Sequence, residues 1–380
     1  MPLPLSQCTV RPDLQLAGTM SATTIIAVLV LALPVVIGIA LFFDGARHTF
    51  HARWLAATHR DRDYRVVRRT ELSTEAFTLT LRPPLLSPVR YQAGQHLVLS
   101  VPIPGGRSVR RAYSISSWSP WPWSVEISIK REASGTGSPQ LYEQARTGRV
   151  FTASPPKGNF ADPDPSAPVV FISAGIGITP FRAMVHRRAR MLRPGKVVLH
   201  LTSRDRDGLF FHEGFERLAA RYAWFTYHPR LTAGADGWTG ESGRLTAQRV
   251  LADAPADSNF MICAGKPMEQ AILDGLRDAG IPDHRLQREQ FAAAAEEAEL
   301  DLAITCAGTT FRPGRATSLL DALDRQGVAP PYECRTGECG ACRVRVLSGT
   351  IKNIETGNPV ADATVLACCV LPTSDVTVAF

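Results

Sequence analysis

The chain reads Cys334-Arg-Thr-Gly-Glu-Cys339-Gly-Ala-Cys342, and a further cysteine, Cys368, follows in Val-Leu-Ala-Cys-Cys. Three cysteines at C-x₄-C-x₂-C spacing, with a fourth downstream, can bring four thiolates to one centre. The glycines between them, Gly337 and Gly340, allow the loop to wrap closely around that centre. The stretch therefore predicts a metal- or cluster-binding loop.

The cysteine spacing distinguishes between an iron–sulfur cluster and zinc. C-x₄-C-x₂-C with a distant fourth cysteine is typical of a plant-type [2Fe–2S] cluster, a one-electron carrier. A structural zinc site usually combines C-x₂-C with a second such pair or with histidines. The nearest preceding histidine is His284 and none follows the motif. Zinc and buried unpaired cysteines are the alternatives, and we predict the cluster.

The fourth ligand is ambiguous because Cys368 and Cys369 are adjacent. Neighbours on a strand point to opposite faces, so only one of the two would face the cluster. The flanking Leu-Ala and the polar turn that follows favour Cys368, with Cys369 as a small buried hydrophobe. The predicted ligands are Cys334, Cys339, Cys342 and Cys368.

Composition limits the class of protein. The 380 residues suffice for two or three domains, and the net charge is a modest +7. The four cysteines outside the predicted ligand set are scattered singly, which favours a reduced, cytoplasmic main body. No aromatic-interleaved basic patch occurs, so nucleic-acid binding is not expected.

Residues 21–43 carry no charge and are strongly apolar, with Pro34 in the middle. A helix of this length spans about 34 Å, which exceeds a hydrocarbon core of roughly 30 Å. A cleaved signal peptide is the alternative, but it has a shorter apolar run after a basic stretch. We therefore expect a transmembrane helix at 21–43, after an N-terminal tail at 1–20.

The charges after this segment set its expected orientation. Arginines are frequent in the basic linker at 44–60 and just beyond it, which favours a cytoplasmic C-terminal side. The predicted localisation is a single-pass membrane protein with its catalytic body in the cytoplasm and the lipid bilayer as a partner.

Short alternating segments follow the linker. Residues 64–72, 77–81, 95–101 and 125–130 alternate apolar and polar residues and are broken by Pro and Gly. This pattern predicts a small antiparallel β-barrel.

Two motifs lie within the predicted barrel. The first is Arg111-Ala-Tyr113-Ser114, in which an arginine can neutralise a pyrophosphate, a tyrosine can lie along a flavin ring and a serine can bond its edge. The second is Gly135-Thr-Gly-Ser138, where glycines precede a helix start whose free N–H groups can hold phosphate oxygens.

In this order the motifs resemble the ferredoxin–NADP reductase family of flavoproteins. The match extends through Gln92-Ala-Gly-Gln95, Lys130-Arg131 and Pro156-Lys-Gly-Asn-Phe160. The resemblance implies FAD, with FMN as the alternative. It also implies flavin and phosphate contacts for Arg111, Tyr113 and Ser114, and pyrophosphate contacts for Gly135 and Ser138.

A βα pattern comes next. An apolar strand at 168–173 runs into Ala174-Gly175-Ile-Gly177-Ile-Thr179-Pro180 and then a helix. A glycine turn that enters a helix is a phosphate site, although the third glycine of the dinucleotide fingerprint is absent. The segment resembles the Gly-x-Gly-x-Thr-Pro turn with which this family holds the NAD(P) pyrophosphate.

Three later segments extend the resemblance. Ser203 and Arg204 follow a second strand and can bind the 2′-phosphate of NADPH, or form a solvated loop. Cys263 ends a third strand where relatives place a cysteine beside the nicotinamide, although the next residues depart from Cys-Gly-Pro. Glu289 and Phe291 match the last strand, which in relatives closes the flavin side.

The predicted fold class is multidomain. It comprises the transmembrane helix, an antiparallel β-barrel flavin domain, an α/β nicotinamide-binding domain and an α+β ferredoxin-like (β-grasp) domain. The expected boundaries are 61–164 for the FAD-binding barrel, 165–292 for the NAD(P)-binding domain and 297–380 for the [2Fe–2S] domain.

The order of domains is that of oxygenase reductase components. The resemblance implies an NAD(P)H-dependent oxidoreductase that passes electrons from NADPH or NADH through FAD and the cluster, without a catalytic residue beyond the cofactor binders. The expected partner is an electron-acceptor protein, a membrane di-iron desaturase or hydroxylase. The alternatives are the reductase of a soluble Rieske oxygenase or P450, a respiratory quinone reductase subunit, and a tethered electron-transfer protein without NAD(P)H turnover.

Overall fold

The structure is a computed structural model, and every residue that it describes lies within Arg60–Phe380. The structure describes residues 61–84, 88–104, 106–120, 122–132, 137–234, 237–289, 298–332, 335, 337, 340–354 and 356–380.

The predicted transmembrane helix is wrong for the structure as described. Within the described ranges no helix is both long and apolar enough to cross a bilayer, and residues 21–43 lie outside those ranges. The longest described helix, α6 (Lys266–Asp278), has 13 residues. At 1.5 Å per residue it extends about 20 Å, which is less than a hydrocarbon core. The predicted fold class is therefore corrected by removing the transmembrane helix. The predicted single-pass membrane localisation depended on that helix and is corrected too.

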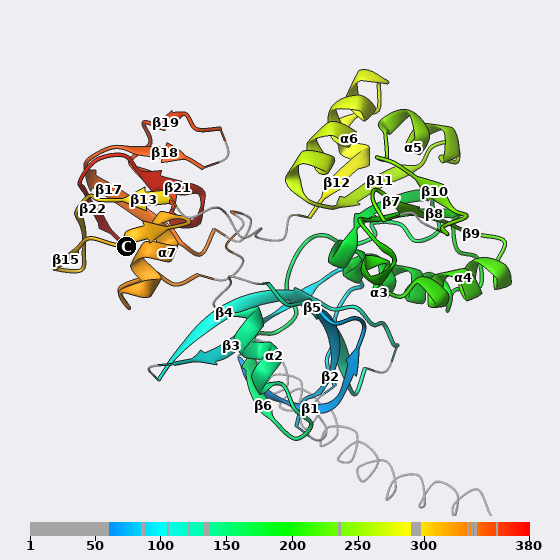
Figure 1. Cartoon of the computed structure of the whole chain (residues 1–380), viewed down its shortest axis with the longest axis horizontal. Helices are drawn as coiled ribbons and strands as arrows, with labels where there is room; N and C mark the ends of the chain where they lie inside the picture. Colours follow the sequence, from blue (N-terminus) through cyan, green and yellow to red (C-terminus); the bar gives the residue numbers. More distant parts are fainter. Residues whose placement is uncertain are drawn as a thin grey trace, which may run out of the picture. The chain divides into compact units, whose positions relative to one another are not determined.

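The N-terminal part of the described chain, from β1 to β6, forms an antiparallel barrel (Figure 1). Its strands follow the order β4-β3-β6-β1-β2-β5, and a bridge between Ile115 and Ile127 joins the two ends of the sheet. Apolar residues alternate inward, as at Tyr64 and Val66 of the first strand. The elements are β1 (Arg62–Glu71), β2 (Ala76–Arg82), β3 (His96–Ile103), β4 (Arg107–Ser114), β5 (Val125–Lys130), α2 (Ser138–Gln144) and β6 (Val150–Ala153).

A parallel sheet with helices follows the barrel (Figure 1). Its order is β10-β9-β8-β7-β11-β12, so the chain builds outward from β7 in one direction and then returns to its other side. The strands are β7 (Val169–Ala174), β8 (Val197–Ser203), β9 (Phe225–Leu231), β10 (Glu241–Ser242), β11 (Asn259–Cys263) and β12 (Leu286–Arg288). The helices, besides α6, are η1 (Gly175–Gly177), α3 (Ile178–Arg188), η2 (Arg206–Gly208), α4 (His212–Arg221), α5 (Ala247–Asp253) and η3 (Asp283–Arg285).

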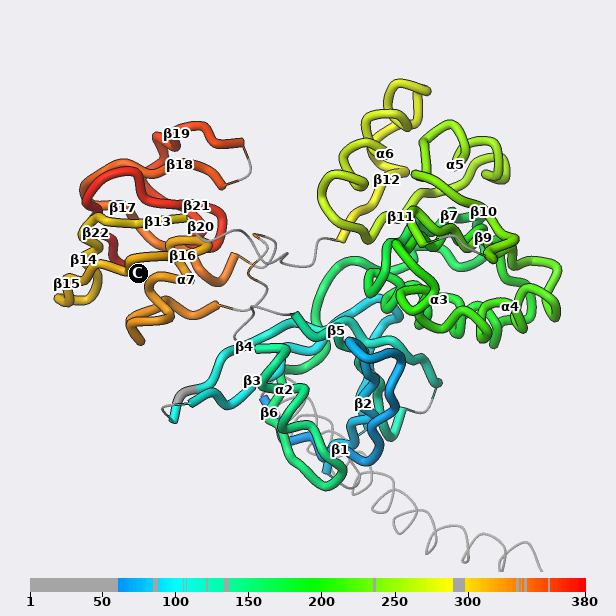
Figure 2. The backbone as a smooth tube through the Cα atoms, viewed as in Figure 1, coloured from blue at the N-terminus to red at the C-terminus, as the bar shows by residue number. Residues whose placement is uncertain are grey.

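The C-terminal part is a mixed sheet, β15-β14-β22-β17-β20, against which α7 packs (Figure 2). A second sheet, β19-β18-β21, and the β13–β16 pair complete it. Its elements are β13 (Ala298–Leu300), β14 (Ile304–Cys306), β15 (Thr309–Phe311), β16 (Gly314–Ala316), α7 (Leu319–Arg325), β17 (Arg343–Ser348), β18 (Ile351–Asn353), β19 (Pro359–Val360), β20 (Thr364–Leu366), η4 (Ala367–Cys369), β21 (Val370–Pro372) and β22 (Val376–Ala379).

A buried ion pair fastens α3 to the segment that leads out of the barrel. The Arg188 guanidinium donates to both carboxylate oxygens of Asp162, at 2.7 and 2.9 Å, and both side chains are fully enclosed. The same guanidinium donates to the carbonyl oxygens of Ala167 and Gly195 at 2.8 and 3.1 Å. These hydrogen bonds compensate the buried charge of Arg188, whose removal from water would otherwise be strongly destabilising.

Replacement of Asp162 by Asn should destabilise the protein by about 3–5 kcal/mol, because Arg188 would remain buried without its counter-charge. Urea unfolding of the full-length protein, followed by tryptophan fluorescence, measures the loss. Arg190→Met, an exposed arginine two residues further along, is the control. Equal unfolding midpoints for the two variants would contradict the role given to this ion pair.

Candidate functional site

Strand β4 presents two of the predicted flavin contacts on one face. Arg111 and Tyr113 are two residues apart and therefore point to the same side of the sheet. Burial lowers the pKa of Arg111 and raises the pKa of Tyr113. A partly desolvated guanidinium next to an aromatic ring is suited to receive an anionic, ring-bearing ligand.

Arg111 also reaches the start of α2, which carries the second motif. A Cβ atom added to Gly137 would lie 2.7 Å from the Arg111 Cγ and 3.0 Å from its Nε, so the arginine crosses directly over this glycine. Ser138, the first residue of α2, is buried and its hydroxyl accepts a hydrogen bond from the Glu132 N–H at 3.0 Å. The fold thus brings Arg111 and Ser138 together, whereas Gly135 lies outside the described residues.

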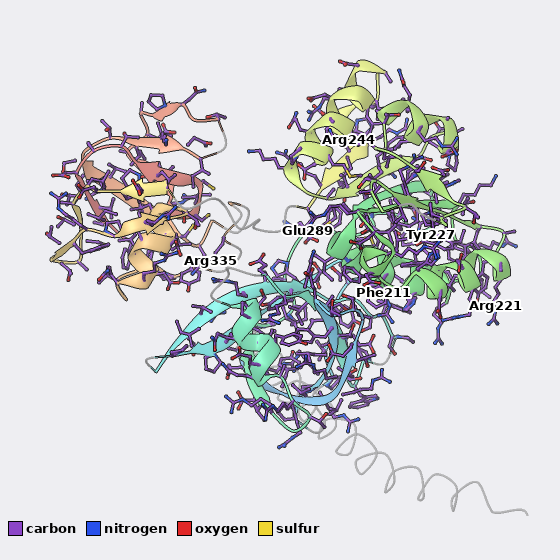
Figure 3. The ribbon with its side chains drawn as sticks, viewed as in Figure 1. Phe211, Arg221, Tyr227, Arg244, Glu289 and Arg335 are labelled. Carbon is purple, nitrogen blue, oxygen red and sulfur yellow. The ribbon has the colours of Figure 1, made fainter. Side chains whose placement is uncertain are left out.

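Ser114 points to the opposite side of β4 and contacts the end of the nicotinamide domain. Its hydroxyl donates to Glu289 Oε2 at 3.3 Å, across 175 positions of sequence. Glu289, labelled in Figure 3, is buried, and its own N–H donates to the Ile262 carbonyl of β11. This hydrogen bond joins two segments that were both predicted to contact the flavin. Phe291, the other residue predicted there, lies outside the described residues.

The glycine turn after β7 lies at the point where the order of the parallel sheet reverses. In open α/β sheets, ligands bind at the carboxyl ends of the strands at such a switch point. Gly175 has a φ of +51°, which favours glycine. A Cβ atom on Gly177 would lie 2.2 Å from the Cys263 carbonyl oxygen and 3.3 Å from its sulfur. The turn and the buried Cys263 therefore meet at this edge.

Helix α3 begins directly from this turn. The hydroxyl of Thr179 is committed to the turn, because it donates to the Ile176 carbonyl at 3.0 Å. Pro180 occupies the first turn of the helix, where its missing N–H leaves no bond unmade. The first turn carries no acidic residue, so the free N–H groups of the helix start are compatible with a phosphate.

Ser203 and Arg204 lie at the end of β8, on the same edge of the sheet as the glycine turn. The backbone carbonyls of both residues hold the loop after β9, and the Arg204 side chain is exposed. Two residues near this loop, Arg206 and Trp238, were not predicted from the sequence. The Arg206 guanidinium lies over the Trp238 ring and donates to the Gly237 carbonyl. Only the fold brings Arg206 and Trp238 into contact, so the sequence carried no signal for this pair.

Arg182 of α3 is a second residue that the sequence did not reveal. Its guanidinium donates to Glu126 Oε2 of β5 at 2.8 Å and to the Ser116 carbonyl at 2.7 Å. The charge of Arg182 contributes to holding the pKa of Glu126 below its usual range, against the opposing effect of burial. These contacts attach α3 to the barrel.

Two of the four predicted cluster cysteines are described, and they meet. β17 pairs with β20, and the Ala367 N–H donates to the Cys342 carbonyl at 2.9 Å. This register brings the sulfurs of Cys342 and Cys368 to 3.3 Å. Two sulfurs that share one tetrahedral metal with bonds of about 2.3 Å lie about 3.7 Å apart, so this pair fits one iron. Cys334 and Cys339 lie outside the described residues.

The local structure around Cys368 differs from the expected strand. β20 ends at Leu366, and Ala367–Cys369 form a 3₁₀ turn. The sulfurs of Cys368 and Cys369 consequently lie 3.6 Å apart rather than on opposite faces. The side chain of Cys369 faces the cluster loop, since a Cβ atom on Gly337 would lie 2.6 Å from its sulfur.

Arg335 anchors the cluster loop to α7. Its guanidinium pairs with Asp324, to which the Tyr332 hydroxyl also donates at 2.9 Å, and it lies over the Tyr332 ring. Arg335 has a positive φ of 61°, an uncommon conformation for a non-glycine residue. This anchor was not predicted, because Asp324 is indistinguishable in the sequence from other surface acids of a helix.

Comparison with known proteins matches three family models in succession. An oxidoreductase FAD-binding domain matches residues 63–161, an oxidoreductase NAD-binding domain residues 171–274, and a 2Fe-2S iron-sulfur cluster binding domain residues 302–373. Together they cover most of the described chain and assign a cofactor to each of its parts.

Several relatives match most of the chain over most of their own length. The ferredoxin reductase component of 3-ketosteroid-9-alpha-monooxygenase from Mycolicibacterium smegmatis is 32% identical over 76% of this chain and 86% of its own. The stachydrine N-demethylase reductase subunit Stc4 of Rhizobium meliloti is 27% identical over 82% and 94%. The fold is similar to that of phthalate dioxygenase reductase, with a TM-score of 0.66 and 21% identity over 84% of this chain and 98% of that one.

The three matched family models, and the large share of the chain that the relatives cover, agree with the contacts described above. The residues that meet at β4, at the sheet edge and at the cluster loop fit FAD, a nicotinamide coenzyme and a [2Fe–2S] cluster respectively. The chain belongs to the ferredoxin–NADP reductase family of flavoproteins that carry a C-terminal [2Fe–2S] domain, and it is an NAD(P)H-dependent flavin and iron–sulfur oxidoreductase.

Proposed function

We propose that this chain is the reductase component of a multicomponent oxygenase, and that its [2Fe–2S] domain delivers single electrons to a separate oxygenase component. FAD and the cluster supply the redox chemistry, converting a two-electron hydride donor into a one-electron source. The observation that carries the proposal is the paired sulfurs of Cys342 and Cys368, 3.3 Å apart, in the same chain as a flavin–nicotinamide core.

The relatives favour one class of acceptor over another. Several are named as reductase components of a steroid monooxygenase, a stachydrine demethylase and a glycine betaine monooxygenase. We therefore prefer a soluble Rieske oxygenase or P450 as the acceptor to a membrane di-iron desaturase or hydroxylase. The desaturase inference depended on a transmembrane helix, which the described residues do not contain.

The residues of this chain act by positioning and by charge. We propose that Arg111 and Ser138 hold the flavin pyrophosphate, with Tyr113 along the ring and Ser114 and Glu289 at its edge. Gly175 and Gly177 leave room for the coenzyme pyrophosphate at the start of α3, where the Thr179 hydroxyl bonds the Ile176 carbonyl and Pro180 starts the helix without an N–H of its own. Cys263 lies beside the nicotinamide, and Ser203 with Arg204 receives the 2′-phosphate if the coenzyme is NADPH.

We propose that the members outside the described residues complete these sets. Gly135 extends the flavin phosphate site, Phe291 closes the flavin side, and Cys334 and Cys339 complete the cluster. The proposed domain limits remain 61–164, 165–292 and 297–380.

Cys342→Ser should separate the two halves of the electron path. We expect NAD(P)H–ferricyanide reduction within about two-fold of the parent, because a flavin can reduce ferricyanide directly. Transfer to cytochrome c should fall more than about ten-fold, since the one-electron exit is lost. Cys306→Ser, at a buried cysteine of β14 whose sulfur contacts the Val328 carbonyl, is the matched control.

The same assay with NADPH and NADH identifies the donor, and a purified candidate oxygenase component tests the acceptor. Undiminished transfer to cytochrome c and to the oxygenase in the Cys342 variant would contradict the proposal. Reduction of a chlorinated benzoquinone that survives loss of the cluster would instead favour the activity for which a 28% identical relative, tetrachlorobenzoquinone reductase of Sphingobium chlorophenolicum, is named.

Serine substitution at Cys368 and at Cys369 tests the fourth ligand. Cys368→Ser should lose or alter the cluster, because this sulfur lies 3.3 Å from that of Cys342, whereas Cys369→Ser should keep its iron. Iron and sulfide content together with the electron paramagnetic resonance spectrum of the reduced protein distinguish the two. Loss confined to the Cys369 variant would reverse the assignment.

Arg111→Ala should weaken FAD binding by about 10- to 100-fold, as expected for loss of a charge-assisted hydrogen bond worth about 1.5–3 kcal/mol. The released flavin is quantified by its fluorescence after gel filtration. Arg110→Ala is a matched control on the opposite face of the strand, where Arg110 pairs with the half-exposed Asp61 at 2.7 Å. Equal flavin retention in both variants would remove Arg111 from the site.

A further inference from the structure

A third cysteine sulfur lies against the pair of sulfurs that fits one iron. The sulfur of Cys369 is 3.6 Å from that of Cys368, which in turn is 3.3 Å from the sulfur of Cys342. Cys369 does not belong to the predicted ligand set, and the electron path proposed above gives it no role. The structure therefore places an additional thiol in contact with a sulfur that is assigned to the cluster.

Backbone hydrogen bonds hold the turn that brings these sulfurs together. Ala367–Cys369 form a 3₁₀ turn between β20 and β21. At its start, the Ala367 N–H donates to the Cys342 carbonyl at 2.9 Å, and at its end the Cys369 carbonyl accepts from the Ile354 N–H at 2.9 Å. Because the turn is bonded at both ends, the neighbouring side chains of Cys368 and Cys369 stay on the same side of the chain.

Gly337 of the cluster loop leaves the space that the Cys369 sulfur occupies. The φ of Gly337 is +87°, in the region that favours glycine, and a Cβ atom at this position would lie 2.6 Å from the Cys369 sulfur. Cys369 is partly buried and packs against the core of the C-terminal domain. Its thiol is therefore enclosed between the cluster loop and the sulfur of Cys368.

From this geometry we infer that the Cys369 thiol donates a hydrogen bond to the Cys368 sulfur and thereby raises the reduction potential of the [2Fe–2S] cluster. The inference rests on the proposed function, because it concerns the centre that releases single electrons. A cysteine ligates iron as the thiolate, so Cys368 has no proton to give and the donor must be Cys369. A thiol is a weak donor, but a hydrogen bond to an ionised acceptor is stronger than one to a neutral acceptor.

The direction of the effect follows from the charges. Reduction of the cluster by one electron, which the flavin supplies, increases the negative charge on the ligating sulfurs. A donor at Cys368 stabilises this reduced form more than the oxidised form, so the potential rises. The proton stays on Cys369, and no bond forms or breaks. Loss of the donor should lower the equilibrium constant for reduction by about three- to ten-fold, which is about 30–60 mV at about 59 mV per ten-fold.

A redox titration of the full-length protein with its cluster loaded tests the inference. The electron paramagnetic resonance signal of the reduced cluster reports the midpoint potential. Cys369→Val fills the space without a donor, so its potential should be about 30–60 mV below that of the parent. Cys369→Ser keeps a donor in its hydroxyl, so its potential should equal or exceed that of the parent.

Cys306→Val is the matched control, because Cys306 is a buried cysteine of the same domain whose sulfur contacts the Val328 carbonyl at 3.7 Å. Its potential should equal that of the parent, and iron and sulfide content verifies that each variant holds its cluster. Equal potentials in the parent and Cys369→Val, or an equal decrease in Cys369→Val and Cys369→Ser, would overturn the inference.

Loss of iron from Cys369→Val would also overturn it, because a thiol that only donates a hydrogen bond is not required to hold iron. These potentials are measured without an electron acceptor, so they are independent of the oxygenase component. Failure to reduce a purified oxygenase component would contradict the proposed function, whereas an unchanged potential in Cys369→Val would contradict the role of this thiol alone.

Discussion

The close approach of the Gly177 backbone to the end of β11 is the constraint on which the central part of the molecule depends. A side chain at position 177 would lie 2.2 Å from the carbonyl oxygen of Cys263, so no other residue fits without separating two elements. This contact lets the start of α3 lie at the edge of the sheet beside the thiol of Cys263. Because β7 and β11 are adjacent parallel strands, the turn and the thiol converge where the strand order reverses.

The neighbouring contacts extend from the same edge into the barrel. Arg182, on the helix that begins at this turn, pairs with Glu126, and Ser114 of the barrel donates to Glu289. These polar contacts are few, but each is largely removed from water and joins segments far apart in sequence. Hydride transfer from a nicotinamide to a flavin requires the two rings to be close and correctly oriented, and contacts between the barrel and the parallel-sheet domain are suited to that task.

Much of the domain order was predictable from local sequence. Strand alternation predicted the barrel, and the strand–glycine–helix order predicted the coenzyme turn, because both depend on residues close together in the chain. The prediction of a transmembrane helix was wrong for the described residues. It rested on the length of one apolar run, and that run lies outside them. The strand expected to continue through Cys368 ends at Leu366 instead, where a 3₁₀ turn brings the two adjacent sulfurs to 3.6 Å. Periodicity over so few residues cannot distinguish a strand from a turn.

The sequence by itself determined the chemistry available to this protein: its cysteine spacing, its glycine turns and its Arg-x-Tyr-Ser motif are local patterns that specify which groups can meet a cofactor. Tertiary structure alone decided which distant groups share a site. The pairing of Ser114 with Glu289, the anchor of Arg335 on Asp324 and the stacking of His200 on His228 all depend on strand register and helix packing. Register and packing arise from burial summed over whole domains, so no short stretch of sequence encodes them.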